Sequence, residues 1–141
     1  MLMKEPGEQD RRRLARIFHQ GVASADRGQV KRAFRRAGKM LAEMERKGVP
    51  EVLSRTWTDI RDLYGMLRDA VTGRYSVPFR SLAAIAVTML YLANPFDLIP
   101  DFIPGIGYID DVFMVSLCVK FIGTDLDKYR QWRSVEGSGP S

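Results

Sequence analysis

The chain of 141 residues is poor in the side chains that most often carry catalysis and metal binding. Its single cysteine, Cys118, excludes an internal disulfide and any site built from several thiolates. Its single histidine, His19, excludes a histidine-rich metal centre and leaves little acid–base chemistry near neutral pH. We therefore expect no enzymatic activity, no metal and no cofactor. Cys118 lies in an apolar run and is expected in the core, and His19 is expected at the surface or at its boundary with the core.

The start of the chain lacks the apolar stretch of a secretory signal, because residues 1–16 are polar and charged. We therefore expect the amino terminus on the cytoplasmic side. Strand patterns are also missing, since no segment alternates apolar and polar residues with a period of two.

Apolar residues instead repeat at spacings of three and four, which predicts helices throughout. Glycine and proline punctuate the pattern. We predict an all-α fold with breaks at 26–28, 48–50, 73–78, 94–108 and 123. The third helix is expected to begin near Glu51, Asn94-Pro95 to end the fourth, and Thr124 to cap the last.

Charge is distributed unevenly. Residues 1–61 hold fifteen Lys and Arg against eight Asp and Glu, whereas residues 81–119 hold four Asp and no basic residue. A basic segment is typical of contact with nucleic acid or anionic lipid, or is simply a solvated surface. No base-reading pattern of aromatic or polar residues accompanies these arginines. We therefore favour a solvated or lipid-facing surface and expect no nucleic-acid partner.

Two apolar segments, 82–93 and 109–122, are predicted to pair as a helical hairpin with a proline-broken connection. A helix that crosses a membrane needs about 20 apolar residues, so each segment is too short to cross cleanly. Two alternatives stay open. The hairpin enters the bilayer without crossing it, with basic flanks on the cytoplasmic side, or it is buried in a helical bundle.

The segment between these helices is rich in proline and aspartate. From Pro95 to Asp111 it reads Pro-Phe-Asp-Leu-Ile-Pro-Asp-Phe-Ile-Pro-Gly-Ile-Gly-Tyr-Ile-Asp-Asp. It resembles the hallmark of the YkvA family, Pro-x-Asp-Leu-Ile-Pro-Asp-Phe-Ile-Pro followed by Gly-x-x-Asp-Asp. Matching positions include Pro95, Asp97, Pro100, Asp101, Pro104, Gly107, Asp110 and Asp111. The flanks Gly73-Arg74-Tyr75 and Tyr129 with Trp132 are similar as well, so the resemblance spans residues 67–133 and implies membrane association without an established activity.

The aspartates of this segment need partners because their surroundings are apolar. We expect Asp97, Asp101, Asp110 and Asp111 to accept hydrogen bonds from backbone amides of the connection and of the first turn of the return helix. A divalent cation remains an alternative, although the spacing is not that of a known calcium loop. Pairing with Arg74 or Arg80 is a further alternative.

These observations predict a basic amphipathic helical extension at 1–50, a YkvA-like helical domain at 51–134 and a flexible tail at 135–141. The expected function is that of a non-enzymatic accessory or scaffold protein, associated with the cytoplasmic side of a membrane through lipid contact. The alternative is a soluble helical binding module whose acidic loop binds a cation or a basic partner. The sequence identifies no protein partner.

Overall fold

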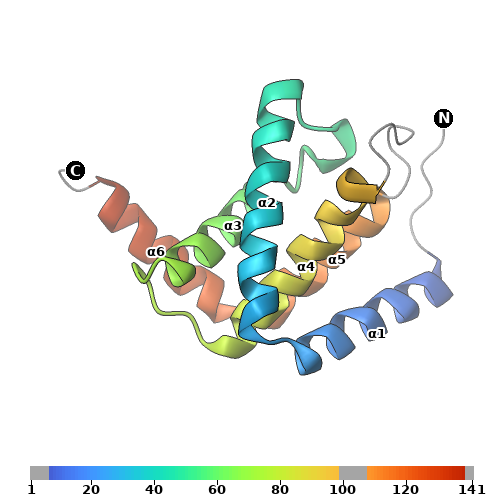
Figure 1. Cartoon of the computed structure of the whole chain (residues 1–141), viewed down its shortest axis with the longest axis horizontal. Coiled ribbons are helices and arrows are strands. Elements are labelled where there is room, and N and C mark those ends of the chain that lie inside the picture. Colours follow the sequence, from blue (N-terminus) through green and yellow to red (C-terminus); the bar gives the residue numbers. More distant parts are fainter. Residues whose placement is uncertain (1–6, 99–107, 139–141) are drawn as a thin grey trace.

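The computed structural model describes residues 7–98 and 108–138, with side chains described for 7–93 and 111–136. All regular secondary structure in these ranges is helical, which confirms the predicted all-α class (Figure 1). The elements are α1 (Glu8–Ser24), α2 (Arg27–Lys47), the short 3₁₀ helix η1 (Glu51–Leu53), α3 (Trp57–Val71), α4 (Phe79–Leu98), α5 (Tyr108–Ile122) and α6 (Thr124–Ser138).

The apolar helix α4 lies at the centre of the bundle and contacts α1, α2, α3 and α5. Figure 1 shows α2 crossing α4, and α5 running beside α4. Small side chains allow this close approach, because Ala83, Ala84, Ala86 and Ala93 are all buried on α4. Much of the apolar surface of α4 is therefore covered by neighbouring helices.

The core extends through both halves of the chain. Leu14 and Phe18 of α1, and six residues of α2, lie in the same cluster of buried residues as α4 and α5. The division into an extension and a domain at residue 50 stays a prediction. At the other end, α6 continues to Ser138, into the segment predicted as a tail.

Local side-chain chemistry explains where α2 begins. Asp26 accepts a hydrogen bond from the amide of Gln29 at 2.8 Å, and the Gln29 side chain accepts one from the Asp26 amide at 3.0 Å. This reciprocal cap starts the helix at Arg27, so Gly28 lies inside α2 and not in the predicted break. The break predicted at 48–50 is confirmed, with Gly48 at φ +106° after the last helical residue.

Two further predicted helix boundaries are wrong. Asn94-Pro95 does not end the fourth helix, because α4 continues to Leu98. A proline inside a helix removes one backbone donor and crowds the carbonyl four residues earlier, but in the last turn of α4 this local cost does not end the helix. The third helix does not begin near Glu51, since η1 occupies that position and α3 starts at Trp57. The Ser54 hydroxyl donates to the Glu51 carbonyl at 2.7 Å and closes this short turn.

The remaining predicted breaks agree with the structure. The connector 73–78 separates α3 from α4, and Gly123, at φ +49°, separates α5 from α6. Thr124 is the first residue of α6 and not its cap. Leu126 and Tyr129, three residues apart on α6, are both buried, which agrees with the predicted spacing of apolar residues.

Candidate functional site

The carboxyl end of α3 positions a buried aspartate, Asp69. Gly73 has φ +80°, a region that favours glycine, and its amide donates to the carbonyl of Ala70 at 3.2 Å. The amides of Arg74 and Tyr75 both donate to the Asp69 carbonyl, at 2.8 and 3.0 Å. This arrangement ends α3 and turns the chain back over its last turn, which places Arg74 and Tyr75 beside Asp69.

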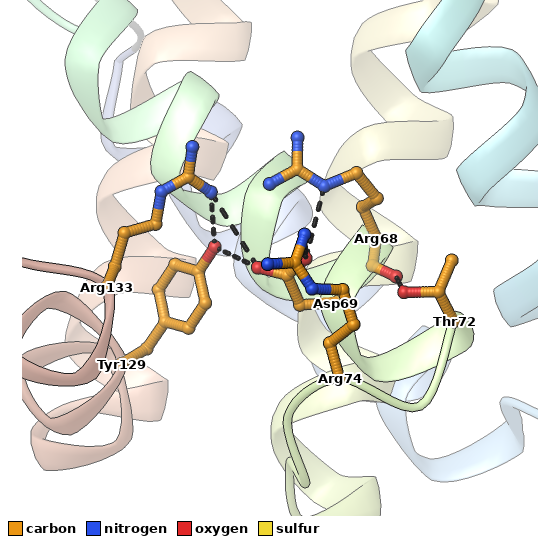
Figure 2. Close-up of polar contacts among 6 residues, drawn as sticks. All are labelled: Arg68, Asp69, Thr72, Arg74, Tyr129 and Arg133. Carbon is orange, nitrogen blue, oxygen red and sulfur yellow. Dashed lines mark hydrogen bonds and ion pairs between the residues drawn. The ribbon is translucent and has the colours of Figure 1, made fainter. Parts of the chain in front are cut away.

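Three arginines from different parts of the chain surround the Asp69 carboxylate (Figure 2). Asp69 is only 1% exposed and accepts hydrogen bonds from the Tyr129 hydroxyl at 2.7 Å and from Arg68 Nε at 3.2 Å. Arg133 and Arg74 form longer ion pairs with it, at 3.7 and 3.9 Å. Arg133 also donates to the Tyr129 hydroxyl at 2.9 Å. We call Arg68, Asp69, Arg74, Tyr129 and Arg133 the Asp69 network.

The shifts in the Asp69 network move the pKa values of its carboxyl, phenol and Arg68 guanidinium further from pH 7. Burial opposes ionisation of Asp69, but hydrogen bonds from Tyr129 and Arg68 outweigh burial and lower the pKa of the carboxyl. Burial and the hydrogen bond to Asp69 raise the pKa of Tyr129. Burial lowers the pKa of Arg68, but the Asp69 carboxylate outweighs this and raises it. These three groups therefore keep their charge states near pH 7 and are suited to holding charge in place.

Aromatic side chains pack beside the Asp69 network. The Tyr75 ring lies 5.3 Å from the Tyr129 ring and 4.8 Å from the Trp132 ring, measured between centroids. Gly65 makes room for Tyr129, because a Cβ atom at Gly65 would lie 2.6 Å from the Tyr129 hydroxyl oxygen. Arg74, Tyr75, Tyr129 and Trp132, which carry the family resemblance in the flanks, are thus neighbours in space.

A second charged group joins α3 to α6. Arg130 Nη2 donates to Asp59 at 2.7 Å, and Arg130 Nε donates to Asp62 at 2.7 Å. Burial lowers the pKa of Arg130, but hydrogen bonds to these two carboxylates outweigh burial and raise it. Carboxylates on α3 therefore face arginines on α6 at two places along the interface.

The basic residues of α2 lie on its exposed side. The buried side of this helix contacts the core, and the exposed side carries five basic residues: Lys31, Arg32, Arg35, Arg36 and Lys39. We call these five residues the α2 basic face. α1 adds four exposed arginines: Arg11, Arg12, Arg13 and Arg16.

The proline- and aspartate-rich segment falls largely outside the described residues. Asp111 is 1% exposed and lies in the first turn of α5, where a negative charge was expected. Pro95 and Asp97 lie on α4 and Asp110 lies on α5, but the side chains at these positions are outside the described part. The remaining predicted site residues are also outside it: Pro100, Asp101, Pro104 and Gly107. The expected amide contacts, and the binding-module alternative based on this loop, stay predictions.

The two arginines considered as partners for these aspartates have other contacts. Arg74 pairs with Asp69, and the Arg80 guanidinium lies 4.0 Å from the centroid of the Phe121 ring. Within the described ranges, no three Asp, Glu, His or Cys side chains are grouped so that they could hold a metal ion.

The single cysteine and the single histidine both lie where the sequence predicts them. Cys118 is buried, and burial raises the pKa of its thiol to about 12 although a hydrogen bond with Thr88 lowers it. His19 is exposed, with its ring 5.3 Å from Phe18 and 5.9 Å from Phe121.

Sequence reasoning did not single out Asp69 as a site residue. The available signal was the alignment of Asp62 and Asp69, seven residues apart on one side of α3, together with Arg130 and Arg133 on α6. Pairing these sets requires knowledge that α3 contacts α6, and that contact is visible only in the folded chain.

Comparisons with known proteins place the chain in a family. The family described as "Protein of unknown function (DUF1232)" matches residues 81–117, which cover most of α4 and the first part of α5. No solved structure matches the chain. Across the described helices, none is both long enough and apolar enough to pass through a membrane. "Uncharacterized membrane protein YkvA" of Bacillus subtilis (strain 168) is 36% identical over 75 residues, or 52% of this chain and 71% of the relative. The chain therefore belongs to the YkvA family, as its proline- and aspartate-rich segment implied.

Proposed function

We propose that this protein is a non-enzymatic accessory protein that associates with the cytoplasmic side of a membrane through electrostatic contact with anionic lipid. The relative from Bacillus subtilis carries the name of a membrane protein. The observation that carries the proposal here is the α2 basic face, because it offers five exposed cationic side chains in about two and a half helical turns.

The strength of such contact follows from the number of charges. Each Lys or Arg close to an anionic membrane surface contributes about 1 kcal/mol, and the attraction falls off within a Debye length. Five residues on one side of α2 are thus sufficient for reversible binding without an inserted helix. α1 carries four further exposed arginines, of which Arg12 is paired with Glu8 at 2.9 Å.

The Asp69 network supports a role without catalysis. The pKa of the Asp69 carboxyl is lowered, and the pKa values of the Tyr129 phenol and the Arg68 guanidinium are raised, so none of these three groups is suited to proton transfer near pH 7. Cys118 is buried with a raised pKa, which disfavours the nucleophilic thiolate.

Cosedimentation with lipid vesicles tests the proposal. We expect the protein to sediment with phosphatidylcholine vesicles that contain about 30% phosphatidylserine, and not with phosphatidylcholine alone. Raising the salt from about 0.05 M to about 0.3 M should release most of the protein, since the Debye length shortens.

A charge-matched pair of variants locates the contact. The triple variant K31Q/R35Q/K39Q should lower vesicle binding at least about tenfold, because it removes three charges from the α2 basic face. The control R55Q/K120Q/K128Q removes three exposed charges elsewhere and should retain most of the binding. Equal losses in the two variants, or no binding of the wild type to anionic vesicles at low salt, would contradict the proposal.

A further inference from the structure

A cleft of about 650 Å³ opens where α2, α3 and α6 meet. Four arginines line it: Arg46 from α2, Arg61 and Arg68 from α3, and Arg133 from α6. Its volume is within the range of small-molecule sites in proteins. The cleft therefore combines room for a ligand with convergent positive charge from three helices.

The nearby carboxylates do not neutralise this charge. Arg68 and Arg133 share the single Asp69 carboxylate with Arg74. Asp62 also lines the cleft and shares Arg130 with Asp59, so it can offset at most one of the four arginine charges. Glu45, the other acidic lining residue, is exposed to solvent.

Arg61 and Arg46 add to the excess of positive over negative charge in the cleft. Arg61 is exposed and has no ion-pair partner among the residues that the structure describes. Arg46 pairs with Glu43 at 2.8 Å on the exposed surface, where solvent weakens the pair. The cleft thus retains an excess of positive charge that an anion could neutralise.

Two of the four guanidinium groups, those of Arg68 and Arg133, are also held in position. Asp69 engages Arg68 through Nε, and Figure 2 shows one terminal nitrogen of Arg68 pointing away from the carboxylate. Arg133 is held by the Tyr129 hydroxyl, which itself donates to Asp69. A guanidinium with fixed orientation binds phosphate oxygens with less loss of conformational entropy.

Two neutral hydroxyl groups also line the cleft. Thr58 and Tyr64 line the cleft, and each can donate a hydrogen bond to an oxyanion. Gly38 faces Tyr64, because a Cβ atom at Gly38 would lie 2.9 Å from the Tyr64 hydroxyl oxygen. Glycine at this position leaves space for that hydroxyl beside the arginines.

We infer that this cleft binds a phosphate monoester, carried either by a soluble metabolite or by a lipid headgroup. A monoester carries a charge between −1 and −2 near pH 7 and has three terminal oxygens, which match several convergent guanidinium donors. The inference goes beyond the proposed electrostatic contact of the α2 basic face, because it concerns different residues and a defined ligand chemistry.

Calorimetric titration with glycerol 3-phosphate tests the site in solution. We expect saturable binding to the wild type and a loss of at least about tenfold in affinity for R61Q, because Arg61 supplies charge to the cleft without supporting the fold. The control R55Q removes an exposed charge outside both the cleft and the α2 basic face and should change affinity by less than about twofold.

A vesicle experiment distinguishes the two sources of the monoester. Phosphatidic acid carries a phosphate monoester, whereas phosphatidylserine carries a diester, so vesicles of equal surface charge separate the site from general attraction. A preference for phosphatidic acid that R61Q abolishes identifies a lipid ligand. Binding of glycerol 3-phosphate without that preference identifies a soluble ligand. Either result supports the site.

Two results would overturn the inference. One is the absence of saturable binding up to about 10 mM glycerol 3-phosphate, well above the affinities typical of metabolite sites, together with no preference for phosphatidic acid. The other is an equal loss of binding in R61Q and R55Q. Both are independent of the K31Q/R35Q/K39Q result, so this site and the membrane proposal can fail separately.

Discussion

The helix pairs α4–α5 and α3–α6 are stabilised by different kinds of contact. Buried residues of α4 and α5 are mostly apolar, including Ile85, Met89, Met114 and Val115. The α3–α6 interface instead joins carboxylates to arginines, with the buried hydrogen bond between Tyr129 and Asp69 among them.

The two kinds of contact differ in how strictly they fix the relative orientation of the helices, as well as in strength. Apolar burial depends on area and tolerates small shifts, whereas hydrogen bonds and ion pairs require donors and acceptors at fixed positions. The α4–α5 pair therefore supplies bulk stability, and the α3–α6 pair fixes how α6 lies on α3. Two of the arginines that line the cleft, Arg68 and Arg133, depend on the second kind of contact.

The largest effect is expected for the change Ile85→Ala on α4. Ile85 is fully buried, and its truncation leaves a cavity in the densely packed centre, so unfolding free energy should fall by about 2–5 kcal/mol. Urea denaturation measures this. The control Val135→Ala, on an exposed residue, should change stability by less than about 0.5 kcal/mol. A loss below about 1 kcal/mol for Ile85→Ala would show that the centre repacks freely.

An intermediate effect is expected for Asp69→Asn, which removes the charge at the centre of the Asp69 network. The loss near pH 7 should be about 1.5–3 kcal/mol, the range for hydrogen bonds to charged groups. Because the folded state lowers the pKa of Asp69, its contribution is present above the unfolded value of about 4 and is lost as pH falls through the folded value.

The stability difference between wild type and Asp69→Asn should therefore shrink as the pH falls below about 4. Denaturation curves measured between neutral and acidic pH check this. The control Asp127→Asn changes an exposed carboxylate and should keep the acid dependence of the wild type. A difference that stays constant with pH contradicts a role for the Asp69 charge.

The smallest effect is expected for Arg130→Gln at the same interface. Arg130, Asp59 and Asp62 have side chains between 31 and 39% exposed, so solvent screens their ion pairs. The loss of unfolding free energy should be below about 1 kcal/mol and should diminish with added salt. Denaturation at low and high salt measures it. A loss above about 2 kcal/mol that salt does not alter would place Arg130 with the buried part of the interface.

Sequence patterns predicted the helical segments well where a local residue decides the boundary. Gly73 and Gly123 end helices at the predicted positions, because their positive φ values favour glycine. The helix end predicted at Pro95 is wrong, because the local bias of proline against helical geometry did not prevent α4 from continuing to Leu98. The structure describes none of the aspartate side chains of the connection apart from Asp111, so the contacts predicted for the others stay predictions.

The sequence by itself determined the all-α class, most helix ends and the membership of the YkvA family, because periodicity, glycine and a contiguous motif are local features of the chain. Only the tertiary structure decided that Asp69 meets Tyr129, sixty positions further along the chain, and that arginines from α2, α3 and α6 line one cleft. The physical reason is that a polar contact between distant residues depends on how the helices pack. The packing around α4 is driven by apolar burial, which is not directional, so the apolar pattern of the sequence does not show which polar side chains will meet.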